Sequence, residues 1–196
     1  METIILATNN KHKLSELRDI LKDHYTVLSL NDANIEIDIP ETGKTFYDNA
    51  LIKARTICNI TKLITIADDS GLMVNALNGA PGVYSSRFAS ENCSTEENNA
   101  KLLRLMTGIE ERKAKFVTVI VMHYPDGRIV SGMGEAMGTI LFEERGTAGF
   151  GYDPLFFSDV LKKTFAEASP VEKNLVSHRA CAIRNLLQNL NGSFKF

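Results

Sequence analysis

The sequence predicts an α/β protein with a mixed β-sheet and helices on both faces. Two observations support this prediction. Early in the chain, short apolar strand patterns alternate with amphipathic helix patterns. Later, two long apolar runs flank a Pro-Asp-Gly turn at residues 125–127, which predicts a hairpin. Polar, glycine-rich segments follow directly after strands, and ligand sites of open α/β sheets form there.

The first two elements follow from local apolar patterns. Residues 4–7, IILA, predict a short buried strand. Residues 14–21, LSELRDIL, predict a helix because their leucines and isoleucine fall on one stripe. Asn9 or Asn10 is suited to cap the start of this helix. Its first turn would then contain the basic residues of the KHK motif.

The middle of the chain continues the alternation. Residues 25–30 predict a strand, and residues 34–45 an extended alternating segment that ends in a turn. Residues 45–62 predict a helix. Its buried side is formed by Ala50, Leu51, Ala54, Ile57 and Cys58. The following strand, which begins as LITIA, is predicted to end at Asp68, Asp69 and the next glycine.

The remaining elements are loops, helices and the hairpin. Two capping boxes, Ser94 with Glu97 and Ser169 with Glu172, mark helix starts. The predicted order is a Gly/Pro-rich loop at 78–88, a helix from 94 to 108, hairpin strands at 114–124 and 128–141, a glycine-rich loop at 144–156, a short helix from 169, and an amphipathic helix at 177–190.

Composition limits the possible functions. The 196 residues suit one domain, either simple or two-lobed, and the net charge of −2 gives no indication of nucleic-acid binding. No apolar run is long enough to span a bilayer, and we expect no signal peptide. Three scattered cysteines suit the reducing cytoplasm, and neither they nor the four histidines have the spacing of a zinc site.

Basic residues occupy two predicted helix starts. Lys11, His12 and Lys13 lie in the first turn of the first helix, where the helix dipole makes each exposed cation unfavourable by roughly 0.3–1 kcal/mol. Lys173 and Arg179 flank the start of the last helix. A single arginine or lysine of this kind is more often an ordinary surface residue, but two such helix starts together call for a bound anion.

Carboxylates and aromatic residues complete the pattern. Asp68 and Asp69 follow a buried strand, and two adjacent carboxylates repel each other unless a cation relieves them. Taken alone, DDSG is more often a solvated turn, and Glu41 is equally uninformative. Together with the basic helix starts and the aromatic rings of Phe150 and Tyr152, these acids describe a polyanion, a divalent cation and a face for a base.

At the level of whole motifs, the sequence resembles the inosine triphosphate pyrophosphatase family, whose members hydrolyse nonstandard purine nucleotides. The similar segments are ATNNKHKLSEL, ETGKTFYDNALIKA, ADDSGL, GAPGVYSSRF, GTAGFGYDPLF and EKNLVSHRA. They occur in the family's order and cover essentially the whole chain. The resemblance implies an elongated mixed sheet flanked by helices, an ITPase-like domain (residues 1–196) of two lobes with a central nucleotide-binding cleft, and a homodimer.

The resemblance also implies the reaction and the roles of individual residues. The expected reaction converts dITP, ITP or XTP to the monophosphate and pyrophosphate with Mg²⁺. Glu41 and Asp69 would bind the metal, and Asp69 would be the general base. The expected nucleotide-binding residues are Thr8, Asn9, Asn10, Lys11, His12, Lys13, Lys53, Ser70, Phe150, Gly151, Tyr152, Asp153, Lys173, His178 and Arg179. Small departures from the family pattern are Asp48, Ala148 and Phe88, of which Phe88 lacks the frequent tyrosine hydroxyl.

Three other functions remain open at this point. The chain could hydrolyse modified pyrimidine or methylated nucleotides, it could sense a nucleotide without hydrolysing it, or it could be an interaction protein with incidental loops. Glu41, Asp69 and the lysines disfavour a pure sensor. An interaction protein leaves the cations at two helix starts unexplained.

Overall fold

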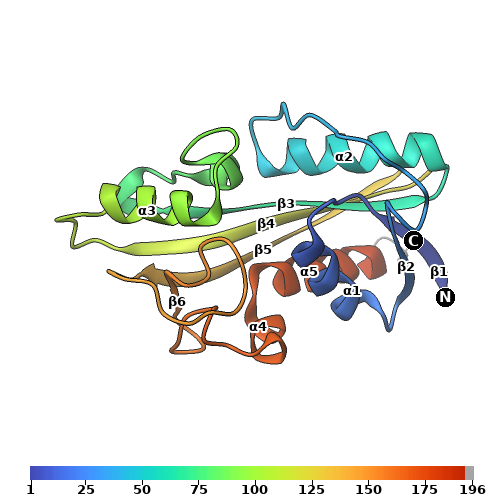
Figure 1. Cartoon of the computed structure of the whole chain (residues 1–196). Coiled ribbons are helices and arrows are strands. Elements are labelled where there is room, and N and C mark those ends of the chain that lie inside the picture. Colours follow the sequence, from blue (N-terminus) through green and yellow to red (C-terminus); the bar gives the residue numbers. More distant parts are fainter. Residues whose placement is uncertain (193–196) are drawn as a thin grey trace. The chain divides into compact units, whose positions relative to one another are not determined.

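The structure is a computed structural model that describes residues 1–192 (Figure 1). Its six strands form one sheet in the order β2-β1-β3-β4-β5-β6. The strands are β1 (Glu2–Leu6), β2 (Tyr25–Ser29), β3 (Ile64–Val74), β4 (Lys113–His123), β5 (Ile129–Ile140) and β6 (Phe156–Ser158). The helices are α1 (Lys11–Leu21), α2 (Phe46–Thr61), α3 (Thr95–Leu105), α4 (Pro170–Val176), α5 (His178–Gly192) and the short 3-10 helices η1 (Asn75–Leu77) and η2 (Gly82–Arg87).

The sheet is mixed, as the sequence predicted. β1 pairs in parallel with β2 and with β3, whereas β5 and β6 pair antiparallel. β4 and β5 are neighbours in the sheet, and the turn that joins them is closed by the Tyr124 amide donating to the Arg128 carbonyl at 2.9 Å. The predicted hairpin is therefore confirmed.

The chain divides into two compact units. The first unit contains Met1–Asp69, Thr118–Gly134 and the described residues from Arg179 onward. The second contains Ser70–Val117 and Glu135–His178. The divisions fall within β3, β4 and β5, so each of these strands contributes residues to both units.

In the first unit, helices cover both faces of the strands (Figure 1). Because strand residues alternate between faces, Ile4 and Leu6 of β1 pack with α1 and α5 in one core. Ile5 of β1 and Ala7, which directly follows β1, pack with α2 in another core. A fully buried aliphatic side chain contributes roughly 1.5–3 kcal/mol, so the alternation fixes the register of β1.

The second unit has an aromatic core. Phe116 of β4 lies 4.6 Å from Phe156 of β6, centroid to centroid, and Phe165 lies 5.0 Å from Phe156. Leu102 of α3 and Met106, which directly follows α3, belong to the same core. These contacts fix the segment between β5 and α4, which contains the glycine-rich loop.

The prediction that β3 ends at the two aspartates is wrong. β3 continues through Asp68 and Asp69 to Val74, and both aspartates are buried. The strand need not end there because Lys13 pairs with Asp68 and Asn49 donates to Asp69. These partners are distant in sequence, so the local pattern favoured a turn.

The extended segment at 34–45 also differs from a strand. No strand is assigned between β2 and α2. Its alternation has another cause, because Ile35, Ile37 and Ile39 pack onto the core that contains α2. β6, η1 and η2 were not predicted. Among residues 1–192, no helix is both long enough and apolar enough to cross a membrane.

Candidate active site

The start of α1 is built as the sequence predicted. Asn10 is the N-cap, and its Oδ1 accepts from the His12 amide at 3.0 Å and the Lys13 amide at 3.1 Å. Thr8 Oγ1 accepts from the Asn10 amide at 3.2 Å, and Asn9 Nδ2 donates to a carbonyl of the extended segment. The first turn of α1 has no acidic residue, so its positive pole carries only cations.

Asp68 supplies a counter-charge for this helix start. Its Oδ2 lies 3.0 Å from Lys13 Nζ and 3.7 Å from Arg179 Nε, and the residue is 1% exposed. Burial alone would raise the pKa of Asp68, but Lys13 and Arg179, together with Lys53, outweigh it and hold the pKa well below its usual range. Asp68 is therefore a fixed anion.

Arg179 has a second partner in the first unit. Its Nη1 lies 2.6 Å from Glu16 Oε2 of α1. The guanidinium, at the start of α5, thus joins α1 to β3 through Glu16 and Asp68. Arg179 and Lys13 therefore both lie beside the same oxygen of Asp68.

Asp69 is in a different environment although it adjoins Asp68. Its Oδ2 accepts from the Asn49 side-chain amide at 3.0 Å, and the residue is 5% exposed. Burial raises the pKa of Asp69, and nearby Glu41 raises it further, against the lowering effect of Lys53 and Lys13. A buried carboxylate whose pKa is raised accepts a proton more readily than Asp68 does.

Asn49 is held in turn by the loop before α2. Its Oδ1 accepts from the Gly43 amide at 2.8 Å. A Cβ on Gly43 would lie 2.6 Å from that Oδ1, so only glycine fits at this approach. The side chain of Asp69 is therefore oriented by a neutral donor whose own orientation is fixed.

Lys53 lies one helical turn after Asn49 on α2. Its Nζ lies 2.5 Å from Glu41 Oε1. Burial would lower the pKa of Lys53, but Asp68, Glu41 and Asp69 together raise it, so the side chain is a firm cation. The first unit thus gathers two lysines and three carboxylates.

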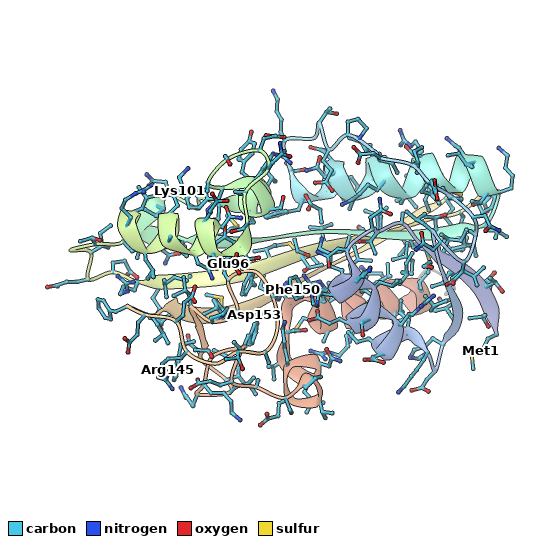
Figure 2. The ribbon with its side chains drawn as sticks, viewed as in Figure 1. Met1, Glu96, Lys101, Arg145, Phe150 and Asp153 are labelled. Carbon is cyan, nitrogen blue, oxygen red and sulfur yellow. The ribbon has the colours of Figure 1, made fainter. Side chains whose placement is uncertain are left out.

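The second unit contains a buried ion pair in its glycine-rich loop. Lys173 Nζ lies 2.6 Å from Asp153 Oδ2, and the two side chains are 6% and 3% exposed. The same oxygen accepts from the Phe150 amide at 2.9 Å, and Figure 2 shows Phe150 and Asp153 together before β6. Lys173 Nζ also lies 4.9 Å from the centre of the Phe150 ring.

This loop requires glycine at Gly149. Its φ is +77°, and a Cβ there would lie 2.2 Å from Asp153 Oδ2. The backbone therefore folds closely around the carboxylate, which fixes the residues on either side of Phe150. His178, at the end of the second unit, is buried, and its ring stacks on Phe116 at 4.7 Å with an interplanar angle of 13°.

Comparison with known proteins identifies the family. A model of the Ham1 family matches residues 4–189. The chain belongs to the Ham1 family. This Ham1-family chain is 47% identical over 204 residues to a dITP/XTP pyrophosphatase of Clostridium perfringens, with 100% of both chains covered.

Solved structures agree with the assignment. The Ham1 protein of Staphylococcus aureus matches with a TM-score of 0.87 and 41% identity, covering 98% of this chain and 100% of that one. A HAM1 protein of Coxiella burnetii matches with a TM-score of 0.88 and 39% identity over the same shares. The predicted fold class, a mixed sheet flanked by helices, is confirmed, as is the family resemblance.

In this Ham1-family fold the expected site residues fall into two groups. The first unit brings together Lys13, Glu41, Lys53, Asp69 and Arg179 around Asp68. The second unit brings together Phe150, Asp153 and Lys173. Ser70 lies in β3 and is half-buried, Tyr152 is buried through its hydroxyl bond to the Ser85 carbonyl, and Lys11 and His12 are exposed.

Two residues of the site were not expected from the sequence. The first is Asn49 as the hydrogen-bond partner of Asp69. A polar residue beside the apolar positions of α2, one turn before Lys53, is a signal that could have found it. The second is Glu16, which pairs with Arg179 and has no distinguishing sequence signal.

The acids of the first unit suit Mg²⁺ rather than a fully protein-bound metal. Glu41 and Asp69 are neighbours that share Lys53 as a counter-charge. Within residues 1–192, no cluster of three or more His, Cys, Asp or Glu side chains could hold a metal ion. Two carboxylates match Mg²⁺, which takes one or two from the protein and completes its shell with water and phosphate oxygens.

Proposed function

We propose that this chain hydrolyses noncanonical purine nucleoside triphosphates, dITP, ITP and XTP, to the nucleoside monophosphate and pyrophosphate. The names of its curated relatives support this substrate class. The observation that carries the proposal is the contrast between Asp68 and Asp69, which are adjacent carboxylates with opposite pKa shifts. Such a pair separates a fixed charge from a reactive base.

The phosphates would bind among the cations of the first unit. Lys13 and Lys53 would hold phosphate oxygens by charge-assisted hydrogen bonds. Lys13 stays oriented by Asp68 on its other side. Lys53 would exchange its contact with Glu41 for a phosphate. The remaining phosphate contacts would come from Thr8, Asn9, Asn10, Lys11 and His12 at the positive pole of α1.

Asp69 would activate the attacking water. The water oxygen bonds to the α-phosphorus, its proton passes to the Asp69 carboxylate, and the bond to the bridging oxygen breaks to release pyrophosphate. Asn49 would hold the carboxylate in the required orientation through its 3.0 Å hydrogen bond. Burial helps because it makes the ionised form of Asp69 a stronger base.

Mg²⁺ would be held by Glu41 and Asp69. Bound there, it would neutralise charge on the phosphate oxygens and lower the barrier to pyrophosphate departure. Lys53 would serve as the counter-charge of both carboxylates until the metal binds, since its ammonium interacts with both of them.

The purine would be recognised by residues of the second unit. Phe150 would stack on the base, with its ring held beside Lys173. The loop residues Gly151, Tyr152 and Asp153 would fix that ring in place, and Ser70 would add a polar contact. Donors at the start of α5, near His178 and Arg179, would meet a 6-keto oxygen. Adenine presents an amine at this position, so ATP would leave a desolvated donor unmatched and bind poorly.

We further propose that residues 1–196 form one ITPase-like domain that acts as a cytoplasmic homodimer. The sharing of β3, β4 and β5 between the two units supports a single folding unit. Cys58, Cys93 and Cys181 form no disulfide with one another, which suits a reducing compartment. A single cooperative unfolding transition and a dimer mass in light scattering are the expected results.

Product analysis tests the proposed reaction. The purified chain is incubated with dITP and Mg²⁺, and pyrophosphate and orthophosphate are measured separately. We expect pyrophosphate, with dITP and XTP hydrolysed far faster than ATP, dUTP or 5-methyl-UTP, and no release when Mg²⁺ is chelated. Orthophosphate as the product, or a preference for the pyrimidines, would overturn the proposal, and so would tight binding without any release.

A further inference from the structure

Two adjacent buried asparagines of α3 hold two different loops of the second unit. Asn98 Oδ1 accepts from the Ala89 amide at 2.7 Å, and its Nδ2 donates to the Ser86 carbonyl at 3.2 Å. Asn99 Nδ2 instead donates to Glu144 Oε1 at 2.7 Å and to the Gly151 carbonyl at 3.3 Å. The two side chains thus have separate targets although they are neighbours in sequence.

The two partners of Asn99 lie at the two ends of the glycine-rich loop. Glu144 begins the segment ERGTAGFG and Gly151 ends it. Three glycines in this segment have positive φ, so the unfolded loop samples many backbone conformations. α3 is fixed by a capping box at its start and by Leu102 in the aromatic core. Asn99 therefore links both ends of the loop to α3, and we call its two hydrogen bonds, to Glu144 and to the Gly151 carbonyl, the clasp.

Other contacts hold the same loop in addition to Asn99. The Phe150 amide donates to Asp153 Oδ2 at 2.9 Å, and the Ala148 amide donates to the Ala166 carbonyl at 3.1 Å. The Tyr152 hydroxyl donates to the Ser85 carbonyl at 2.8 Å, and Asp153 pairs with Lys173. The last two contacts fix the residues after Gly151. The bond from Asn99 holds the Gly151 carbonyl, in the peptide between Gly151 and Tyr152. Gly151 has a positive φ, so this bond restrains the glycine that directly follows Phe150.

We infer that Asn99 is a positioning residue for the purine, acting through the Gly151 carbonyl on the ring of Phe150. This inference rests on the proposed role of Phe150 in stacking on the base. Loss of the clasp leaves the loop to be ordered by the nucleotide, which weakens binding. Asn99 donates to residues of the second unit, whereas Asp69, Lys13 and Lys53 belong to the first, so we expect the chemical step to be unchanged.

The experiment compares Asn99→Ala with Asn98→Ala as a matched control. We expect Asn99→Ala to raise KM for dITP about five- to twentyfold with kcat within about twofold. Asn98→Ala removes three side-chain hydrogen bonds from the same helix, including one from the Cys93 thiol, and should still leave KM within about twofold. An unchanged KM in Asn99→Ala, or an equal rise in both variants, would overturn the inference.

Glu144→Ala and a double variant test the same hydrogen bond even if Asn99→Ala fails to fold. Glu144 is exposed, so Glu144→Ala breaks one bond of the clasp without burying a defect, and KM should rise about two- to fivefold. Asn99→Asp should raise KM more, because it places a carboxylate against Glu144. Adding Glu144→Gln to Asn99→Asp should recover part of that loss. No effect of Glu144→Ala and no recovery in the double variant would contradict the clasp.

Phe150→Ala separates the two proposals. If it leaves KM for dITP unchanged, the proposed stacking role of the loop fails. If it raises KM while Asn99→Ala does not, the base-binding role stands and the positioning role of Asn99 fails.

Discussion

Each unit contains a buried cluster of charges, and the two clusters differ in how well those charges are matched. In the second unit, Asp153 has an ammonium at 2.6 Å and a backbone amide at 2.9 Å on the same oxygen. In the first unit, Asp68 is matched in the same way by Lys13 and Arg179. Its neighbour Asp69 receives a neutral amide from Asn49, and burial raises its pKa. We infer that Asp68 and Asp153, which are paired with cations, stabilise the structure, and we propose that Asp69 is the reactive group.

Among the stability changes, breaking the ion pair between Lys173 and Asp153 should have the largest effect. Lys173→Met leaves the Asp153 carboxylate buried without its ammonium, which costs about 3–5 kcal/mol of unfolding free energy. Urea denaturation measures this loss of unfolding free energy. Lys163→Met is the control, because its ion pair with Glu172 is exposed to solvent, so its loss should lower the unfolding free energy much less. Equal losses in the two variants would show that burial of the pair is unimportant.

The loss of unfolding free energy caused by Asp68→Asn should depend on pH. The pKa of Asp68 is lower in the folded chain than its ordinary value of 3.8, so its charge stabilises the fold above about pH 4 and this contribution is lost as the pH falls further. We expect Asp68→Asn to cost about 2 kcal/mol at pH 7 and less at pH 3. Denaturation at both pH values measures the difference.

The ionised carboxylate of Asp69 should have the opposite effect on stability from that of Asp68. Because its pKa is raised, the ionised form opposes folding at neutral pH, and stability is gained as the pH falls through the raised pKa. Asp69→Asn should therefore not lower the unfolding free energy at pH 7. A pH dependence in which Asp68→Asn and Asp69→Asn behave alike would contradict the contrast between them.

Phe150→Ala tests whether the second cluster serves recognition. Stacking on a base is worth roughly 1–3 kcal/mol, so KM for dITP should rise about tenfold while kcat stays within about twofold. Phe142→Ala is the control, since Phe142 is 77% exposed and stacks on Arg112 instead. A fall in kcat with unchanged KM would show that Phe150 contributes to the chemical step rather than to recognition of the base.

Features set by neighbouring residues were predictable from the sequence. The Asn10 cap and the capping boxes at Ser94 and Ser169 depend on side chains within three residues, and all are present as predicted. The buried side of α2 was also predicted, with Leu51 partly buried and the other four positions buried. Helix periodicity suffices for that because the stripe must face the core.

Features set by distant partners were not predictable. β3 runs through Asp68 because Lys13 and Arg179, far away in sequence, neutralise it. The same partners reverse the effect of burial on its pKa. The sequence drew attention to both aspartates, and the family resemblance gave a role only to Asp69. The different environments of Asp68 and Asp69 are visible only in their three-dimensional contacts.

The most direct test of this distinction is pyrophosphate release from dITP by Asp69→Asn in the presence of Mg²⁺. The variant keeps the shape of the side chain and removes its ability to take a proton. We predict that kcat falls at least about a hundredfold while the unfolding free energy is not lowered. Turnover close to that of the unaltered chain would remove Asp69 from the reaction and contradict the assignment of the two carboxylates.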